Sequence, residues 1–136
     1  MERKDKGEKD FGNLLVHVVC KAGSDRSRLI AEELNKRGYL ATHGGIDKTY
    51  NYTTPEDLVG VGTIIFTSDY IRDVFKTNKE LTRVARLNNA KSIVLCISEE
   101  EKEHAFQAGS QGINKLRKTI ADRLDIFGFE YKKMKY

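Results

Sequence analysis

Four short apolar segments alternate with segments whose apolar residues recur at helical spacing, and this alternation limits the possible fold more than any other feature. The strand-like segments cover residues 14–19, 39–42, 63–67 and 92–97. The helical segments begin near residues 27, 55, 69, 79, 98 and 113. Strands that alternate with helices form a parallel sheet with helices packed on both faces. We therefore predict one three-layer α/β domain over residues 13–136, with a four-stranded parallel sheet flanked by helices.

Composition limits the class of protein further, because a chain of 136 residues has the size of one domain. No apolar stretch approaches the roughly 18 residues of a membrane-spanning helix, so we expect no membrane contact. Two cysteines are too few for a disulfide framework and favour a reducing, cytoplasmic setting. The net charge of +4 suits an anionic ligand but does not by itself indicate nucleic acid. Residues 1–12 carry four basic and four acidic side chains, which predicts a disordered charged leader.

Residues 20–27, which we call the Cys20 loop, begin where the first apolar segment ends and close with Arg26 and Ser27. A loop with Gly and Ser between a buried strand and a helix can turn its amide N–H groups inward, and the helix N-terminus adds a positive field. That field holds an oxyanion and favours the thiolate form of Cys20. Ligands of open parallel sheets bind at the carboxyl ends of the strands, which is where Cys20 falls. We expect a cysteine nucleophile that meets a phosphate-like ligand.

The Cys20 loop resembles the phosphate-binding loop of the low-molecular-weight protein tyrosine phosphatases and of the arsenate reductases that share their fold. Weaker similarity extends to Gly44-Gly45, at a small-residue turn after the second strand, and to residues 66–74, at the third strand and its helix. The resemblance implies that Cys20 is the nucleophile, Arg26 the clamp on the phosphoryl oxygens and Ser27 the donor to the leaving thiolate.

The same resemblance implies two further sets of site residues. Around the bound phosphate lie Arg26 and the rest of the loop, namely Lys21, Ala22, Gly23, Ser24 and Asp25. The entrance is walled by Tyr50 and Tyr52, whose rings would stack on an aromatic substrate. The sequence of the loop also looks like the signature of dual-specificity phosphatases, but those proteins carry this signature late in the chain. The order of elements favours the low-molecular-weight type.

The sequence departs from this family at the general acid. The family donates a proton from an Asp-Pro turn near the end of the chain, and the only proline here is Pro55, far from such a position. Glu99 and Glu100, after the fourth strand, are the leading replacements, and Asp69, after the third strand, is another. Proton donation to a leaving group is worth about a hundred- to ten-thousand-fold in rate, so its loss would leave a slow enzyme.

Asp25 is a second departure, because a carboxylate inside the loop opposes a dianionic ligand. We expect its side chain to point outward or to pair with Arg26 or Arg28. A pair with Arg26 would lower the affinity for phosphate.

Other residues with reactive side chains have structural interpretations. Cys96 lies in an alternating strand and is expected to be a buried core thiol. His17 points to the opposite sheet face from Cys20 and is expected to be structural. His43 and His104 lack partners at ligand spacing, so no metal site is predicted.

The sequence therefore predicts a phosphatase that hydrolyses a phosphoester, of the phosphotyrosine type, through a phosphocysteine intermediate and without a cofactor. Its partner would be a phosphorylated small molecule or a phosphoprotein, with neither membrane nor nucleic acid. Three alternatives remain open. The first is an arsenate reductase, which needs Cys96 as a second reactive cysteine. The others are a phosphocarrier domain and a non-catalytic module that binds phosphate or phosphoproteins.

Overall fold

The sheet of the computed structural model, which describes residues 14–132, has four strands that all run parallel. Their order across the sheet is β2-β1-β3-β4. The strands are β1 (Leu15–Cys20), β2 (Leu40–Gly45), β3 (Thr63–Phe66) and β4 (Lys91–Val94). The predicted α/β class and four-stranded parallel sheet are confirmed. The predicted leader at residues 1–12 lies outside the described residues.

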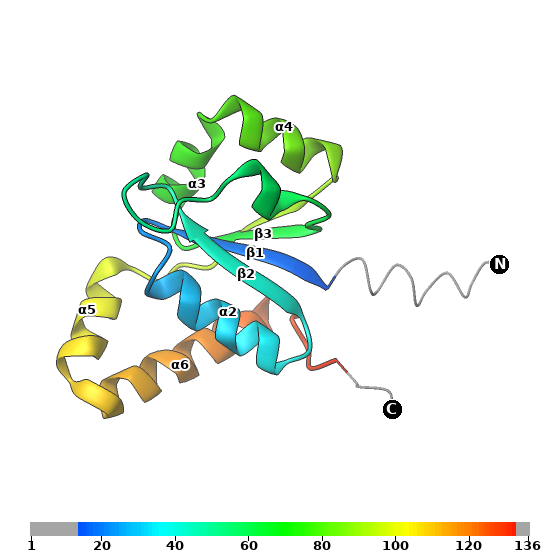
Figure 1. The fold of residues 1–136 in the computed structure, drawn as a ribbon. Helices are drawn as coiled ribbons and strands as arrows, with labels where there is room; N and C mark the ends of the chain where they lie inside the picture. The colour runs from blue at the N-terminus through cyan, green and yellow to red at the C-terminus, as the bar shows by residue number, and fades with distance from the viewer. Residues whose placement is uncertain (1–13, 133–136) are drawn as a thin grey trace.

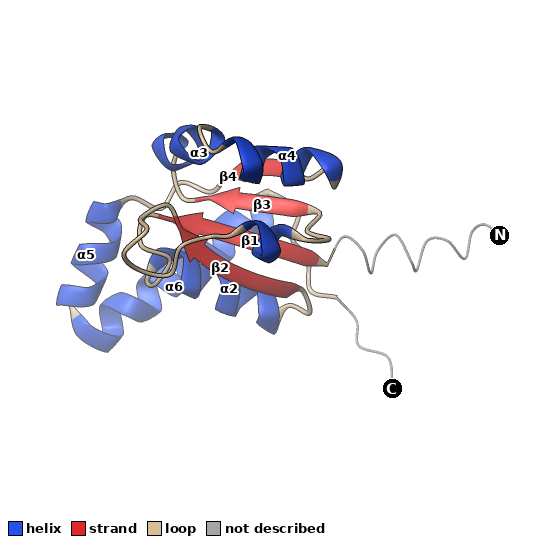
Figure 2. Cartoon of the chain, turned by 45° about the horizontal axis from the view of Figure 1, so that its top comes forward, coloured by secondary structure: helices blue, strands red, loops and turns tan. Residues whose placement is uncertain are grey.

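Helices cover both faces of this sheet, as Figures 1 and 2 show. On one face lie α2 (Arg26–Lys36) and α6 (Gly109–Ile126). The buried side of α5 (Glu99–Gln107) packs into the same hydrophobic core as these two helices. On the other face lie α3 (Asp69–Lys76), α4 (Lys79–Leu87) and the short 3-10 helix η1 (Pro55–Leu58). The domain thus has three layers with the sheet in the middle.

The alternation of side chains along β1 explains why this strand lies at the centre. Val16 and Val18 pack in the core beneath α2 and α6, whereas Val19 packs in the opposite core with α3 and α4. A strand buried on both faces reads as a continuous apolar run, which is the pattern of a central parallel strand. The register pairs Cys20 with Gly45 of β2 and Val19 with Phe66 of β3.

Local side-chain chemistry sets the start of the helices that follow β3 and β4. The hydroxyl of Ser68 accepts from the N–H of Ile71 at 3.2 Å and so caps α3. Ser98 caps α5 through a capping box, in which its hydroxyl accepts from the N–H of Glu101 at 3.0 Å and its own N–H donates to the Glu101 carboxylate. Each cap satisfies N–H groups that the first turn of a helix leaves free. The predicted starts near residues 69 and 98 are confirmed.

Three predicted element boundaries were wrong. The second strand continues to Gly45 and does not end at residue 42. The fourth strand ends at Val94 and not at residue 97, although the N–H of Ile97 still donates to the carbonyl of Thr67 at 3.1 Å. The last helix begins at Gly109 and not near residue 113, so Gly112 lies inside α6. A Cβ at this position would meet the carbonyl oxygen of Ala105 at 2.3 Å, so the close approach of α5 and α6 requires a glycine.

None of the helices among residues 14–132 is both long enough and apolar enough to cross a membrane.

Candidate active site

The site predicted from the sequence lies where the winding of the sheet reverses. After β1 the chain first forms β2 on one side of it and then crosses to form β3 on the other side. Loops that follow neighbouring strands diverge at such a point and leave room for a ligand at the carboxyl ends. Cys20 is the last residue of β1, so the Cys20 loop begins at this reversal.

The backbone carbonyls of the Cys20 loop are held from outside by the segment that follows β2. The N–H of Ile46 donates to the carbonyls of Cys20 and Lys21, at 3.1 and 2.9 Å. The N–H of Asp47 also donates to Lys21, and the N–H of Asn51 donates to Ala22 at 3.2 Å. These bonds turn the carbonyls of the loop toward residues 46–51.

The carbonyl of Gly23 is held in the same direction by two side chains. His43 Nδ1 and Asn51 Nδ2 both lie 2.9 Å from this oxygen. Gly23 has φ +76°, and a Cβ there would lie 2.5 Å from backbone atoms of Asn51, Gly44 and Gly45. Only glycine combines this left-handed conformation with such close packing.

Because the C=O and the next N–H of a peptide plane point in opposite directions, outward carbonyls turn the following amides inward. The N–H of Gly23 donates to the sulfur of Cys20 at 3.1 Å. Within residues 14–132, the N–H groups of Ala22 and Ser24 have no hydrogen-bond partner. With the free amides in the first turn of α2, they form a concave set of donors of the kind that binds anions.

Cys20 and Ser27 are brought together at the base of this concavity. Both side chains are buried, and the Ser27 hydroxyl oxygen lies 3.1 Å from the Cys20 sulfur. Ser27 occupies the first turn of α2, whose dipole favours negative charge at that end. The sulfur therefore has two neighbours, the Ser27 hydroxyl and the Gly23 N–H, that can donate to a thiolate.

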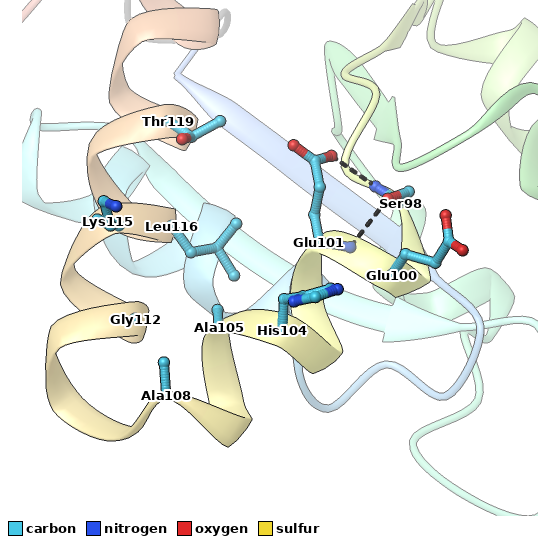
Figure 3. A pocket seen from close by; sticks show the side chains of 10 residues that line it. All are labelled: Ser98, Glu100, Glu101, His104, Ala105, Ala108, Gly112, Lys115, Leu116 and Thr119. Atoms are coloured by element: carbon cyan, nitrogen blue, oxygen red, sulfur yellow. Dashed lines mark hydrogen bonds between the residues drawn. The ribbon is translucent and has the colours of Figure 1, made fainter.

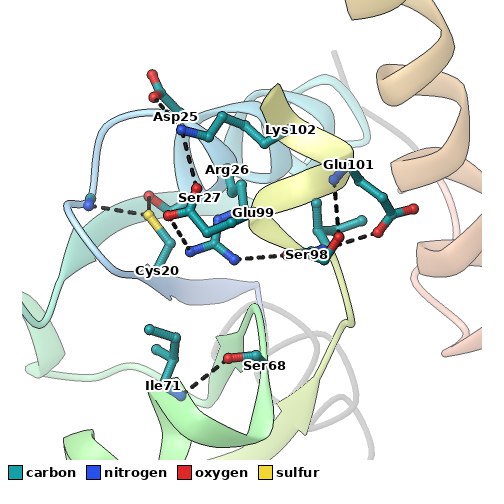
Figure 4. A network of polar contacts seen from close by, with 12 residues as sticks. Cys20, Asp25, Arg26, Ser27, Ser68, Ile71, Ser98, Glu99, Glu101 and Lys102 are labelled. Carbon is teal, nitrogen blue, oxygen red and sulfur yellow. Dashed lines mark hydrogen bonds and ion pairs between the residues drawn. The ribbon is translucent and has the colours of Figure 1, made fainter. Parts of the chain in front are cut away.

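Arg26 is also buried, and its guanidinium is anchored at the start of α5 (Figure 4). Its Nη1 donates to the carbonyl of Ile97 at 2.8 Å. Its Nη2 lies 3.4 Å from Oε2 of Glu99. A guanidinium has five N–H donors, so donors remain for a further acceptor.

Asp25 does not pair with either of the arginines considered from the sequence. Its carboxylate lies 3.4 Å from the Lys102 ammonium group, which is also 3.2 Å from Oε1 of Glu99. Burial pulls the pKa of Lys102 down, but its hydrogen bond and ion pair with Glu99 and its contact with Asp25 outweigh burial and raise it. Lys102 is therefore a charged link between α5 and the Cys20 loop.

The three candidate general acids occupy different places. Glu99 contacts Arg26, as described above. Glu100 lines a groove between α5 and α6 with His104 and Lys115, and Figure 3 shows this groove. Asp69 is exposed and pairs with Arg72 at 3.1 Å. Of these acids, Glu99 is the one that the structure brings to the Cys20 loop.

The two tyrosines predicted to wall the entrance come from the segment that braces the loop. Tyr50 is 67% exposed, so its ring is free to meet a ligand. The hydroxyl of Tyr52 accepts from Asn78 Nδ2 at 3.2 Å, which ties this ring to the start of α4. Contact of either ring with a substrate stays a prediction.

The expectation for Cys96 was wrong, and that for His17 agrees with the structure. Cys96 is exposed, because β4 has already ended and the neighbouring Leu95 and Ile97 take the buried positions. His17 is fully buried, with Nδ1 2.7 Å from the Thr42 hydroxyl and Nε2 2.9 Å from the Thr53 hydroxyl. Burial lowers the pKa of His17 from 6.5 to about 4, against a smaller upward effect of Asp57.

Four residues near the loop were not found from the sequence. His43 and Asn51 brace Gly23, and neither has a spacing that relates it to Cys20. Lys102 stands three residues after Glu99, a helical spacing that signals an ion pair. Thr67 follows β3 beside Cys20, and its hydroxyl is the one buried side-chain polar atom among residues 14–132 without a hydrogen-bond partner. In residues 14–132 no group of three or more His, Cys, Asp or Glu side chains gathers in a way that could hold a metal ion.

Comparison with known proteins gives no assignment: no family model, curated protein or solved structure matches this chain at a significant level.

Proposed function

We propose that the protein is a cysteine-dependent phosphatase that hydrolyses a phosphomonoester, of the phosphotyrosine type, at the Cys20 loop. The observation that carries the proposal is the outward hydrogen bonding of the loop carbonyls from Cys20 to Gly23. It turns the loop amides toward the cysteine sulfur and so combines a nucleophile with an oxyanion cradle. The resemblance to the low-molecular-weight phosphatases supports the same reaction.

The proposed reaction has two steps. The Cys20 thiolate attacks phosphorus in line, a sulfur–phosphorus bond forms, and the bond from phosphorus to the leaving oxygen breaks. Arg26 and the loop amides stabilise the negative charge on the equatorial oxygens. Water then attacks the phosphocysteine, which releases inorganic phosphate and regenerates the thiolate. Ser27 supports the second step, because its hydroxyl donates to the thiolate as the thiolate leaves phosphorus.

Glu99 is the proposed proton donor to the leaving oxygen, and it would accept a proton from water in the second step. Its position at the loop supports this role over that of Glu100 or Asp69. In the unliganded arrangement its two oxygens face Arg26 and Lys102, so it must turn toward the substrate. This requirement predicts a slow enzyme with preference for good leaving groups.

Burial of the nucleophile supports the proposed class of substrate. Cys20 is only 3% exposed, so a phosphoryl group must reach it on a long and narrow side chain. A phosphotyrosine side chain satisfies this requirement better than the shorter phosphoserine. The partner would be a phosphoprotein or an aromatic phosphoester, and two unpaired cysteines support a reducing, cytoplasmic setting.

A direct test is to trap the intermediate. The protein is mixed with p-nitrophenyl phosphate, quenched in acid within the first turnover, digested and examined by mass spectrometry. We expect one phosphoryl group on the peptide that contains Cys20 and none on the peptide that contains Cys96. A phosphoryl group on another residue, or hydrolysis without any labelled peptide in a single turnover, would contradict the mechanism.

A second candidate is a non-catalytic module that binds phosphorylated partners. It is favoured by one observation, that Glu99 faces Arg26 and Lys102 with both of its oxygens. Such a module would be stabilised thermally by phosphate but would release no nitrophenol from p-nitrophenyl phosphate.

A phosphocarrier would instead form a phosphocysteine and hold it, rather than release the phosphate into water. The arsenate reductase alternative receives less support, because Cys96 is exposed whereas Cys20 is buried, and its neighbours Leu95 and Ile97 take the core positions on the Cys20 face of the sheet.

A further inference from the structure

Four side chains of alternating charge cross the mouth of the Cys20 loop. Asp25 lies 3.4 Å from Lys102, Lys102 lies 3.2 Å from Glu99, and Glu99 lies 3.4 Å from Arg26. Figure 4 shows this row between the loop and the first turn of α5. The two acidic and two basic groups sum to zero, so the row itself offers no net attraction to an anion.

Glu99 meets Arg26 at the nitrogen that an oxyanion needs. A guanidinium binds an oxyanion through two parallel N–H groups, either Nε with Nη2 or Nη1 with Nη2. Each geometry uses one of the two N–H groups on Nη2, and Nη2 is the atom that faces Glu99. A bound phosphate and the carboxylate would therefore lie a few ångströms apart, where like charges repel strongly.

Arg26 does not need Glu99 to stay in place. Its Nη1 donates to the carbonyl of Ile97 at 2.8 Å, and the side chain is only 5% exposed. Glu99 is 48% exposed and has Lys102 as a second partner. The carboxylate can therefore leave Arg26 while it keeps its contact with Lys102 at the mouth of the loop.

We propose that Glu99 is an internal competitor of the oxyanion, and that it sets the affinity of the Cys20 loop for tetrahedral dianions by placing its negative charge against Arg26 Nη2. Lys102 is the positioning residue that holds the displaced carboxylate beside the ligand. This inference rests on the proposed oxyanion site at the Cys20 loop. It adds that the resting site is weakened by its own carboxylate, independently of whether Glu99 donates a proton.

The test is a calorimetric titration with tungstate, a tetrahedral dianion. It compares the affinity of the wild type for tungstate with the affinities of two variants that each lose one negative charge. Glu99→Gln removes the carboxylate from Arg26. Glu103→Gln removes the same charge one helical turn further along α5, at an exposed position. We expect Glu99→Gln to bind tungstate on the order of tenfold more tightly. Glu103→Gln should remain within about twofold of the wild type, because exposed charges at that range are screened.

The outcomes separate this inference from the proposed function. If the wild type binds tungstate and Glu99→Gln binds no more tightly, the inference fails and the oxyanion site stands. Weaker binding by Glu99→Gln would instead assign Glu99 to holding Arg26 in place, which also overturns it. If neither the wild type nor Glu99→Gln binds tungstate, both proposals fail. Should Glu99→Gln not fold, Glu99→Asp, which shortens the side chain by one methylene and keeps the charge, is expected to bind more tightly than the wild type by a smaller factor.

Discussion

The hydroxyl oxygen of Ser27 lies 3.1 Å from the sulfur of Cys20, and both side chains are buried. The two residues close the loop from opposite ends, since Cys20 ends β1 and Ser27 lies in the first turn of α2. The contact therefore depends on the whole path of the loop between them. Through this contact the fold places a hydroxyl donor directly beside the proposed Cys20 thiolate.

Replacement of Ser27 by Ala should slow the breakdown of the phosphocysteine more than its formation. A hydrogen bond to a charged group contributes about 1.5–3 kcal/mol, which corresponds to roughly a tenfold to hundredfold lower rate of thiolate departure. Rapid-quench kinetics with p-nitrophenyl phosphate should then show a burst of nitrophenol followed by a slower steady state. Equal burst and steady-state rates, at wild-type values, would remove Ser27 from the mechanism.

Gly23→Ala should both destabilise the protein and abolish oxyanion binding. The left-handed conformation costs a residue with a Cβ about 1–2 kcal/mol, and overlap with backbone atoms at 2.5 Å adds to this cost. Gly109 supplies a matched control, because it has φ +72° but nothing within 4 Å of its Cβ position. Urea unfolding should show a loss of about 1 kcal/mol for Gly109→Ala and a loss at least twice as large for Gly23→Ala. Similar losses for both variants would contradict the tight packing of the loop.

The stability of the fold should fall in mild acid because of His17. Its pKa is about 4 in the folded protein, whereas an unfolded chain gives the ordinary value of 6.5. Between these values the unfolded state binds a proton that the folded state does not, so the free energy of unfolding decreases as the pH falls from 6.5 toward 4. The full effect is on the order of 3 kcal/mol. Urea unfolding at a series of pH values across this interval measures it.

A His17→Gln variant is the control for that pH dependence. Glutamine keeps a polar group near the hydroxyls of Thr42 and Thr53 but does not titrate. The variant should be less stable than the wild type at neutral pH and should lose less stability on acidification. An equally steep pH dependence in the variant would show that another group causes it.

Removal of the buried charge of Arg37 should lower the free energy of unfolding strongly. Its guanidinium, 2% exposed, pairs with Glu33 at 2.9 Å and with Asp125 at 2.8 Å, and donates to the carbonyls of Ala121 and Phe129. Arg37→Met removes the cation from the mostly buried Glu33 carboxylate and from the Phe129 carbonyl, whereas the exposed Asp125 can be hydrated, so the loss should lie near the lower end of the about 3–5 kcal/mol that a broken buried pair costs. Arg37→Lys keeps the charge but lacks the planar donor set, so its loss in urea unfolding should be intermediate. A loss below about 1 kcal/mol for Arg37→Met would contradict this role.

Much of the fold was predictable, because apolar periodicity reports burial directly. The run at residues 14–19 identified a strand buried on both faces, and the helix starts near residues 69 and 98 were found because local side-chain caps set them. The end of the fourth strand was predicted wrongly because residues 95–97 keep the alternation of a strand after the regular ladder has ended. The last helix was predicted to start too late, near residue 113, because the approach of α5 that requires Gly112 is a tertiary contact, which a local pattern does not show.

The candidate site was less predictable than the fold. The Cys20 loop was evident from one stretch of sequence, since its proposed nucleophile, its arginine and its hydroxyl lie within eight residues. The groups that shape it come from elsewhere: His43 and Asn51 hold Gly23, and Lys102 reaches Asp25 across 77 positions. Such contacts depend on how loops meet at the edge of the sheet, and no spacing within the chain encodes them.

We propose that Cys20 is the nucleophile of a phosphatase, and the experiment to make first compares the hydrolysis of p-nitrophenyl phosphate by the wild type and by Cys20→Ser. The assay is run across about pH 5 to 8, since a thiolate phosphatase acts on this activated ester even with a weak general acid. We predict turnover by the wild type and none by Cys20→Ser, while phosphate still raises the melting temperature of the variant. Hydrolysis by Cys20→Ser at the wild-type rate would contradict the claim.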